Sequence, residues 1–284
     1  GFLRMALRIV TDSTADLSEE LRREYGIEMV PLTVQFGSES HKDVVEMSID
    51  DFWAKLKTDP RHPKTAQPAP GDFLEVYQRL HAEGHEILSI HLSEKLSGTV
   101  NSGRIAAQML PEAQITVVDT LSVSLGLGMM CIQAARMAQD GKSTAEIVAW
   151  LADTAKRTYI LFTLDTLDFL QKNGRVGKAQ ALIGGLLGIK PILEIADGVV
   201  EPADKVRGKS KVLSRTLELL EERVPAGRRI MLGVVHAQVP EEAAGWVAEV
   251  KKRYTVAETF VAPIGPVIAT NAGPGAIGIL MFEV

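Results

Sequence analysis

Apolar runs alternate with amphipathic helical patterns through the first half of the chain. Short apolar runs predict strands, and apolar residues spaced three and four apart predict helices. Asp16 opens the first helical pattern, and Ser48 with Asp51 forms a capping-box pattern before another. The predicted elements in order are strand 7–10, helix 17–25, strand 29–36, helix 48–57, helix 71–83, strand 86–92, helix 98–109, strand 114–118, helix 123–139 and helix 144–157.

This alternation of strands and helices is typical of a parallel sheet with crossover helices. Ligands of such sheets bind beyond the carboxyl ends of the strands, where the strand-to-helix loops gather. Three loops satisfy this rule, and they span residues 11–14, 93–99 and 119–124. We therefore expect a ligand site at that edge.

The segment 58–70 interrupts the alternation with four prolines. Proline lacks the N–H that helices and central strands need, so this segment is predicted to be neither. Long loops within compact domains are usually functional or disordered. Thr65 lies in this loop, where simple exposure is its plainest interpretation.

In the second half, the most informative stretch surrounds Gly174 and Arg175. A helical pattern ends at Asn173 and Gly174, the usual left-handed stop, and Arg175 follows at once. Residues 179–189 are almost wholly apolar with glycines at intervals, so a helix there would be buried on all sides or would border an apolar cavity. The stretch indicates either buried packing with a capping arginine or a charged head beside an apolar tunnel.

The remaining pattern predicts a mixed sheet. Asp197 and Gly198 join two apolar runs with the strongest short-range signal for a hairpin turn. Residues 265–275 form a glycine-rich loop between the last two strands. The predicted elements are strand 159–163, strands 189–196 and 199–206, helix 209–223, strand 229–236, helix 240–252, strand 255–263 and strand 276–284.

Composition narrows the possible functions. A chain of 284 residues favours two domains, here 1–157 and 158–284. Its net charge of −5, without a basic patch, argues against a nucleic-acid partner. A single cysteine, Cys131, suits a reducing cytoplasm, and no apolar run is long enough to span a membrane. Gly1–Arg4 precede Met5, where we expect the native sequence to start.

Few stretches carry recognisable chemistry. Ser97-Gly98-Thr99 lies where a strand ends and a helix begins, a position that suits an anion, although Ser97 as a plain N-cap explains it equally. The turn from Asn271 to Ala276 would let a backbone approach a ligand, or would simply connect two strands tightly. The histidines lack metal-ligand spacing, and no nucleophile has a visible base, so we expect no metal site and no catalytic residues.

Together these pieces resemble the DegV family, whose bacterial members bind fatty acids and include the acyl-carrier component of fatty-acid kinase. Each motif is short, but they occur in the family's order over nearly the whole chain. The matching pieces are Thr11-Asp12-Ser13, Thr65-Ala66-Gln67-Pro68, Ser97-Gly98-Thr99, Val118-Asp119-Thr120 with Gly126 and Gly128, Asn173-Gly174-Arg175, Lys190-Pro191, Ile264-Gly265 and Gly273-Pro274-Gly275-Ala276.

The resemblance implies an α/β protein with a three-layer α/β/α first domain on a parallel sheet and a two-layer second domain on a mixed sheet. It also implies a cytoplasmic, non-enzymatic lipid-binding protein that buries a long-chain fatty acid, such as palmitate, stearate or oleate, between its domains. The carboxylate would be held by Thr65, Ser97 and Asn271, and presented to a separate ATP-dependent fatty-acid kinase. Thr99, Arg175 and Ala66 would border the headgroup or face the partner. The wall of the tail pocket would come from Leu182, Ile183, Leu186, Leu187 and Ile189.

Two positions depart from the family pattern. Ala66 stands where members often have serine, so one hydroxyl donor is missing. Asn271 stands where many have histidine, and an amide cannot carry a proton at neutral pH as imidazole does. Carboxylate binding is compatible with both changes, whereas a role of this loop in phosphoryl transfer is not supported.

One alternative comes from a different functional class. The helix start at Ser97 would also suit an enzyme that acts on a small phosphorylated or carboxylated substrate in the cleft between the domains. A polar cleft with perturbed carboxylates would favour that alternative, and an apolar tunnel would favour fatty-acid binding.

Overall fold

The computed structural model describes residues 6–284, so the expected start at Met5 falls outside the described residues. The described chain forms two compact units. The first contains the chain up to Lys156 together with Gly265–Val267, and the second contains Arg157–Ile264 and Ile268–Val284. The division after Lys156 lies one residue from the predicted boundary, whereas the return of residues 265–267 to the first unit was not predicted.

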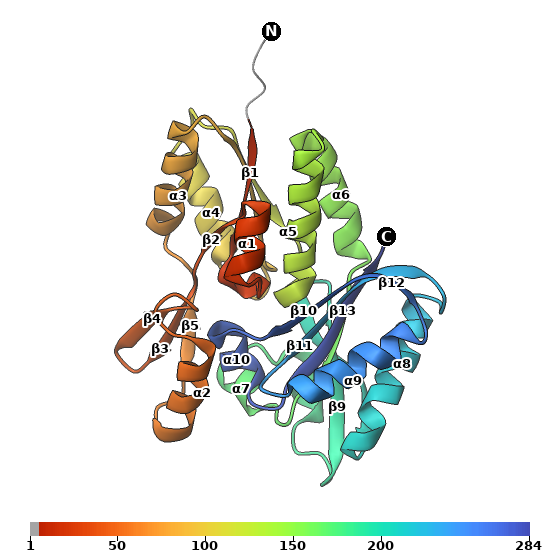
Figure 1. The fold of residues 1–284 in the computed structure, drawn as a ribbon. Helices are drawn as coiled ribbons and strands as arrows, with labels where there is room; N and C mark the ends of the chain where they lie inside the picture. Colours follow the sequence, from red (N-terminus) through yellow and green to blue (C-terminus); the bar gives the residue numbers. More distant parts are fainter. Residues whose placement is uncertain (1–5) are drawn as a thin grey trace. The chain divides into compact units, whose positions relative to one another are not determined.

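The first unit is built on a four-stranded parallel sheet with strand order β2-β1-β6-β7 (Figure 1). Helices α3 and α4 cover one face, and α1, α5 and α6 cover the other, which gives the expected three layers. The elements are β1 (Leu7–Asp12), the 3₁₀ turn η1 (Ser13–Ala15), α1 (Glu19–Tyr25), β2 (Glu28–Val30), α3 (Pro70–Ala82), β6 (Glu86–His91), α4 (Thr99–Gln108), β7 (Ile115–Asp119), α5 (Ser124–Gln139) and α6 (Thr144–Lys156).

A small antiparallel sheet, β4-β3-β5, accompanies the main sheet of this unit. It comprises β3 (Thr33–Phe36), β4 (Glu39–Lys42) and β5 (Lys64–Ala66), and α2 (Ile49–Thr58) packs Phe52 against Phe36. The predicted single strand 29–36 was wrong, because Pro31 separates β2 from β3 and cannot donate to a ladder. The proline-rich segment does contain a strand, β5, at the edge of the sheet, where proline is tolerated.

The loops expected to gather at the carboxyl edge are hydrogen-bonded to one another. Both N–H and Oγ1 of Thr120 donate to the carbonyl of His91. The N–H of Glu94 donates to the Asp119 carboxylate at 3.2 Å. The N–H of Leu92 donates to the Asp12 carboxylate at 3.2 Å, so the ends of β1, β6 and β7 are linked directly.

Asp12 is the centre of this edge, fully buried and bonded to four donors. Its Oδ1 accepts from the N–H and the hydroxyl of Thr14, and its Oδ2 accepts from Leu92 N–H and His91 Nδ1. The His91 Nε2 then accepts from Ser89 Oγ, which in turn accepts from the Tyr77 hydroxyl at 2.7 Å. These partners fix the tautomer of His91 with its proton on Nδ1.

The second unit holds a six-stranded mixed sheet in the order β10-β9-β8-β13-β11-β12. Only β11 and β12 are parallel among its pairs, and α8 and α9 cover one face, which gives the expected two layers. The elements are β8 (Tyr159–Thr163), α7 (Asp168–Lys172), the 3₁₀ helix η2 (Gly177–Leu182), β9 (Ile189–Ala196), β10 (Val199–Arg207), η3 (Lys209–Lys211), α8 (Val212–Arg223), β11 (Arg229–His236), α9 (Pro240–Lys251), β12 (Thr255–Pro263), α10 (Pro266–Ala272) and β13 (Ile277–Glu283).

The predicted hairpin is confirmed, with Asp197 and Gly198 both at positive φ between β9 and β10. Two predictions were wrong. The glycine-rich loop 265–275 contains the helix α10, and the apolar segment 179–189 forms the end of η2 and a turn instead of an α-helix. The segment contains three glycines, of which Gly184 and Gly188 have positive φ, and these disfavour a continuous helix. In residues 6–284, no helix combines the length and hydropathy needed to cross a membrane.

Gly128 provides a test of how closely α5 is packed, and Gly245 in α9 serves as its control. A Cβ on Gly128 would lie 2.5 Å from the carbonyl oxygen of Ala15, so Gly128→Ala should destabilise the first unit by about 1–3 kcal/mol despite the better helix propensity of alanine. Gly245 in α9 has no neighbour within 4 Å of the corresponding position, so Gly245→Ala should stabilise its unit by about 0.5–1 kcal/mol. Urea unfolding measures both, and a stabilised Gly128→Ala protein would contradict the close packing.

The four-donor arrangement of Asp12 predicts a large effect of an isosteric change. In Asp12→Asn, one carboxylate oxygen becomes an NH₂ group that faces two buried donors, and we expect a loss of about 2–3 kcal/mol in the free energy of unfolding. Asp140→Asn, at an exposed helix end, should stay within about 0.5 kcal/mol of the original protein. Equal stability of the two variants in urea unfolding would show that Asp12 does not hold the edge together.

Candidate ligand-binding site

Ser97 and Thr99 form a hydroxyl pair at the start of α4. Their oxygens lie 2.8 Å apart, and Ser97 Oγ also accepts from the N–H of Thr99 at 3.3 Å. The N-cap residue is Gly98, so Ser97 closes a short turn before the helix and is not itself the N-cap. Thr99 is buried and Ser97 is half-buried. Either hydroxyl can be the donor in this pair, and when Thr99 donates, the Ser97 hydroxyl proton can be directed to an anion.

Thr65 lies on the edge strand β5, opposite Val34 of β3. The segment that carries it adjoins the start of α4, because a Cβ on Gly98 would come within 2.9 Å of the Gln67 amide nitrogen. Thr65 and Ala66 are half-buried. The first unit therefore brings the Thr65 and Ser97 segments side by side, although they are 32 positions apart in the sequence.

Asn271 and Arg175 are paired in the second unit. Arg175 Nη1 donates to Asn271 Oδ1 at 3.1 Å, and this contact assigns the amide orientation of Asn271. Asn173 strengthens the connection by donating from Nδ2 to the carbonyl of Thr270 at 3.2 Å. Burial lowers the pKa of Arg175, which nevertheless stays a cation at physiological pH. The pair therefore places a guanidinium beside an amide, and neither group exchanges a proton near neutral pH.

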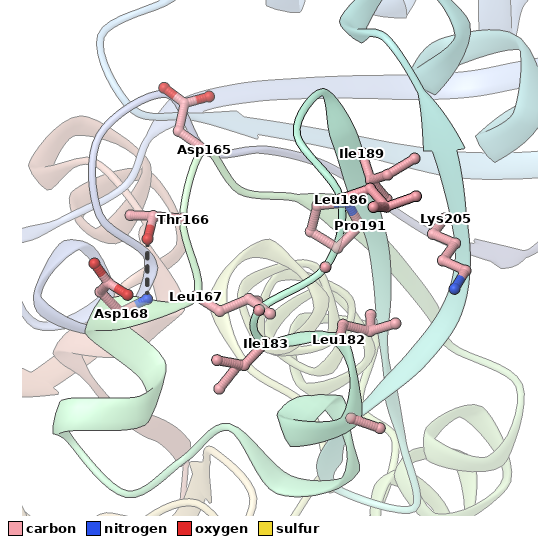
Figure 2. Close-up of a pocket in the computed structure, with 13 residues that line it drawn as sticks. Asp165, Thr166, Leu167, Asp168, Leu182, Ile183, Leu186, Ile189, Pro191 and Lys205 are labelled. Atoms are coloured by element: carbon pink, nitrogen blue, oxygen red, sulfur yellow. Dashed lines mark hydrogen bonds between the residues drawn. The ribbon is translucent and has the colours of Figure 1, made fainter.

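A cavity of about 490 Å³ lies in the second unit beside the end of η2. Of the five predicted tail residues, Leu182, Ile183, Leu186 and Ile189 line it. Leu187 does not line it and is 98% exposed. Figure 2 shows the polar side chains of this cavity on two sides, with Asp165, Thr166 and Asp168 on one segment and Lys205 on β10.

The glycine-rich turn before β13 approaches side chains of its own unit. Gly273 and Gly275 both have positive φ. A Cβ on Gly275 would lie 2.0 Å from an Asp165 oxygen, and one on Gly273 would lie 2.5 Å from the Phe169 ring. The tight connection to β13 therefore requires these glycines. This agrees with the interpretation that the turn connects two strands tightly.

Asp12, His91 and Ser89 are hydrogen-bonded in the same order as the side chains of a hydrolase triad, but their environment does not suit catalysis. All three side chains are fully buried, and the Ser89 hydroxyl already accepts a hydrogen bond from the Tyr77 hydroxyl and contacts His91 Nε2. Cys131 is also buried, and desolvation raises the pKa of its thiol to about 12, which disfavours a thiolate. Among residues 6–284, no group of three or more His, Cys, Asp or Glu side chains could hold a metal ion.

Two carboxyl groups have strongly raised pKa values, Asp16 and Asp43. They line none of the described cavities. The polar cleft with perturbed carboxylates that would favour an enzyme is therefore not found among these cavities. The sequence marked Asp16 only as the start of a helical pattern and did not mark Asp43, because the effect on their pKa values depends on contacts with distant segments.

Comparisons with known proteins agree with this description. The family model of the DegV family, described as an uncharacterised protein family, matches residues 6–284. A DegV domain-containing protein of Halalkalibacterium halodurans is 36% identical over 277 residues, which are 97% of this chain and 98% of that protein.

Solved structures show the same fold. A DegV family protein from Thermus thermophilus, described by its fatty acid binding, has a TM-score of 0.93 and 36% identity, with 99% of this chain and 100% of that chain covered. A stearic acid-binding protein from Eubacterium ventriosum has a TM-score of 0.87 and 26% identity, with 98% of each chain covered. With the family's motifs, its fold and its sequence matched over nearly the whole length, this chain belongs to the DegV family.

Proposed function

We propose that this protein binds a long-chain fatty acid and holds the carboxylate for transfer to a partner. The observation that carries the proposal is the cavity beside η2, which is lined by four of the apolar side chains expected to contact an acyl tail. The relatives from T. thermophilus and E. ventriosum, which are described as fatty-acid-binding proteins, support the same ligand class. Palmitate, stearate and oleate are the chemical type that we expect.

The tail supplies most of the affinity. Each methylene removed from water contributes about 0.8 kcal/mol, so an acyl chain of ordinary length contributes on the order of 10 kcal/mol before the cost of association is subtracted. Leu182, Ile183, Leu186 and Ile189 are the side chains that we assign to this contact. Leu187 is exposed and is not needed for it.

The carboxylate head of the fatty acid determines how the ligand is oriented in the site. A carboxylate removed from water must receive hydrogen bonds, or it would take up a proton instead. We assign its donors to Thr65 and Ser97, with Thr99 directing the Ser97 hydroxyl outward and Asn271 as a further amide donor. Ala66 adds no donor, so this head site relies on fewer hydroxyls than is usual in the family.

We further propose that the recipient is an ATP-dependent fatty-acid kinase in the cytoplasm, and that Arg175 faces this partner. Arg175 is half-buried and is held by Asn271, so its position is determined before any partner arrives. Because neither group transfers a proton at neutral pH, the chemistry of phosphorylation belongs to the kinase. The binding protein then contributes only the placement of the carboxylate.

Removal of the head donors tests the ligand assignment. Gently purified protein should release a long-chain fatty acid in mass spectrometry, and added acid should raise its melting temperature. Ser97→Ala and Thr65→Ala should each weaken fatty-acid binding by about 5–30-fold, as expected for the loss of one hydrogen bond to a charged group. Neither half-buried hydroxyl should affect urea unfolding by more than about 1 kcal/mol.

Two outcomes would contradict this assignment in different ways. Protein that releases no fatty acid and is not stabilised by added acid does not bind this ligand class. Protein that binds fatty acid with unchanged affinity in both variants has its head site elsewhere.

A matched pair of variants tests the tail. Ile183→Ala removes apolar surface from the cavity and should weaken binding by about tenfold, whereas Leu187→Ala, outside the cavity, should leave affinity unchanged. Isothermal titration with a saturated acid measures both. Equal losses in the two variants would mean that the acyl chain contacts the exposed turn as much as the cavity, which would contradict the assignment of the tail to the cavity alone.

A further inference from the structure

Two carboxyl groups of the first unit, the half-buried Asp16 and the fully buried Asp43, hold one short backbone segment. Asp16, which follows η1, accepts from the N–H of Gly265 at 2.9 Å. Asp43, which follows β4, accepts from the N–H of Val267 at 3.3 Å. Residues 265–267 belong to the first unit, although the chain on both sides of them belongs to the second. The two carboxyls are therefore two side chains that anchor this returning segment by hydrogen bonds to its backbone.

The surroundings of these carboxyls contain negative charge and hydroxyls. Asp16 also accepts from Ser124 Oγ at 2.6 Å, and Asp43 interacts with the Ser13 hydroxyl. Asp12 acts on both through its charge, and no cation among the described residues contributes to either. The nearby turn carries Lys42 and Glu46, both exposed to solvent.

Desolvation is the dominant influence on both groups. It raises the pKa of Asp16 to about 7 and that of Asp43 to about 8, and the charge of Asp12 raises both further while the hydrogen bonds oppose the rise. Asp43 is 0% exposed, and its Oδ2 has no hydrogen-bond partner among the described residues. An ionised carboxylate is poorly accommodated there, because burial of a charge without a counter-charge is costly.

The backbone at this place is also strained. Asp16, Val44 and Ser124 are not glycines, yet they have φ values of 52°, 55° and 55°. A positive φ is unusual for any L-residue and especially for a β-branched one such as Val44. Such conformations persist only where surrounding contacts hold them, and they concentrate in clamps and switch regions. Weakening of the carboxyl contacts therefore removes part of what maintains this strain.

We propose that Asp16 and Asp43 form a proton-controlled latch on residues 265–267, which is closed when the two carboxyls are neutral and loosens when they ionise. When both are charged, they and Asp12 place three negative charges in one poorly hydrated space. Local opening of the segment admits water and relieves this repulsion. The latch does not depend on the identity of the ligand that the protein carries.

The sign of the pH dependence follows from linkage. Both folded-state pKa values, about 7 and about 8, lie above the ordinary value of 3.8. The folded, closed form therefore binds more protons than the opened form. The contribution of the two groups is fully present below about pH 4 and is lost as pH rises through 7–8. Opening should therefore increase over this range, including the interval from pH 6 to pH 8, and change little above it.

Amide hydrogen exchange of the full chain tests the latch. After correction for the intrinsic base-catalysed rate, the protection factors of the Gly265 and Val267 amides should fall at least about tenfold between pH 6 and pH 9. Asp43→Asn and Asp16→Asn each remove one titrating group while an amide oxygen remains for the N–H, and asparagine tolerates the positive φ of position 16. Each variant should show a smaller fall, and Asp140→Asn, with its exposed carboxylate, should retain the full fall.

Constant protection in the original protein, or an undiminished fall in both variants, would overturn the proposal. If the variants do not fold, carbon-13 detection of the Asp43 carboxyl in the original protein decides instead. A titration midpoint above pH 6 supports the latch, and a midpoint near pH 4, the ordinary range of an aspartate, rules it out.

Discussion

The carboxylate of Asp12 is the constraint on which the first unit depends. A fully buried carboxylate is tolerated only when each of its oxygens receives hydrogen bonds, and here four donors from two loops and a histidine satisfy it. These donors come from the segments that end β1 and β6. Because the buried Asp12 carboxylate needs these hydrogen bonds, it fixes the segments that end β1 and β6. Ser97 lies in the loop that follows β6.

The same edge shows how a parallel sheet gathers the loops that form the candidate binding site. The strands bring the loops together, the backbone of one loop satisfies the carbonyls of another, and the remaining side-chain hydroxyls are left at the start of α4. Ser97 is held by both the hydroxyl and the N–H of Thr99. Preorganisation of this kind favours binding, because little side-chain entropy is lost when the ligand arrives.

Local signals in the sequence predicted most elements, and tertiary effects explain the failures. Asp197 and Gly198 specify their hairpin because both need positive φ, which depends on no distant residue. Pro31 is the local signal, overlooked in the prediction, that divides the expected strand 29–36 into β2 and β3. The turn at residues 183–188 and helix α10 were mispredicted because apolar or glycine content alone does not distinguish a turn from a helix.

The site was predictable to the extent that it depends on local sequence. Ser97 and Thr65 were identifiable from a helix start and from motif resemblance, and the first unit places their segments together. The Asp16 and Asp43 pair was not identifiable, since an aspartate has the same sequence appearance whether it is hydrated or enclosed by residues more than 200 positions away. Burial of a titratable group is a property of the fold, and only the structure reveals it.

Asn271 holds the Arg175 guanidinium but does not change its charge near neutral pH, whereas a histidine at this position could do both. The amide accepts from the guanidinium through its oxygen, so the orientation of the amide is fixed. An imidazole at this position would change its charge and its donors near neutral pH. With asparagine, the polarity of the group that pairs with Arg175 is independent of pH over that range. Proton-dependent behaviour of this chain near neutrality must then originate at other groups, and the enclosed carboxyls of the first unit are the strongest source that the structure provides.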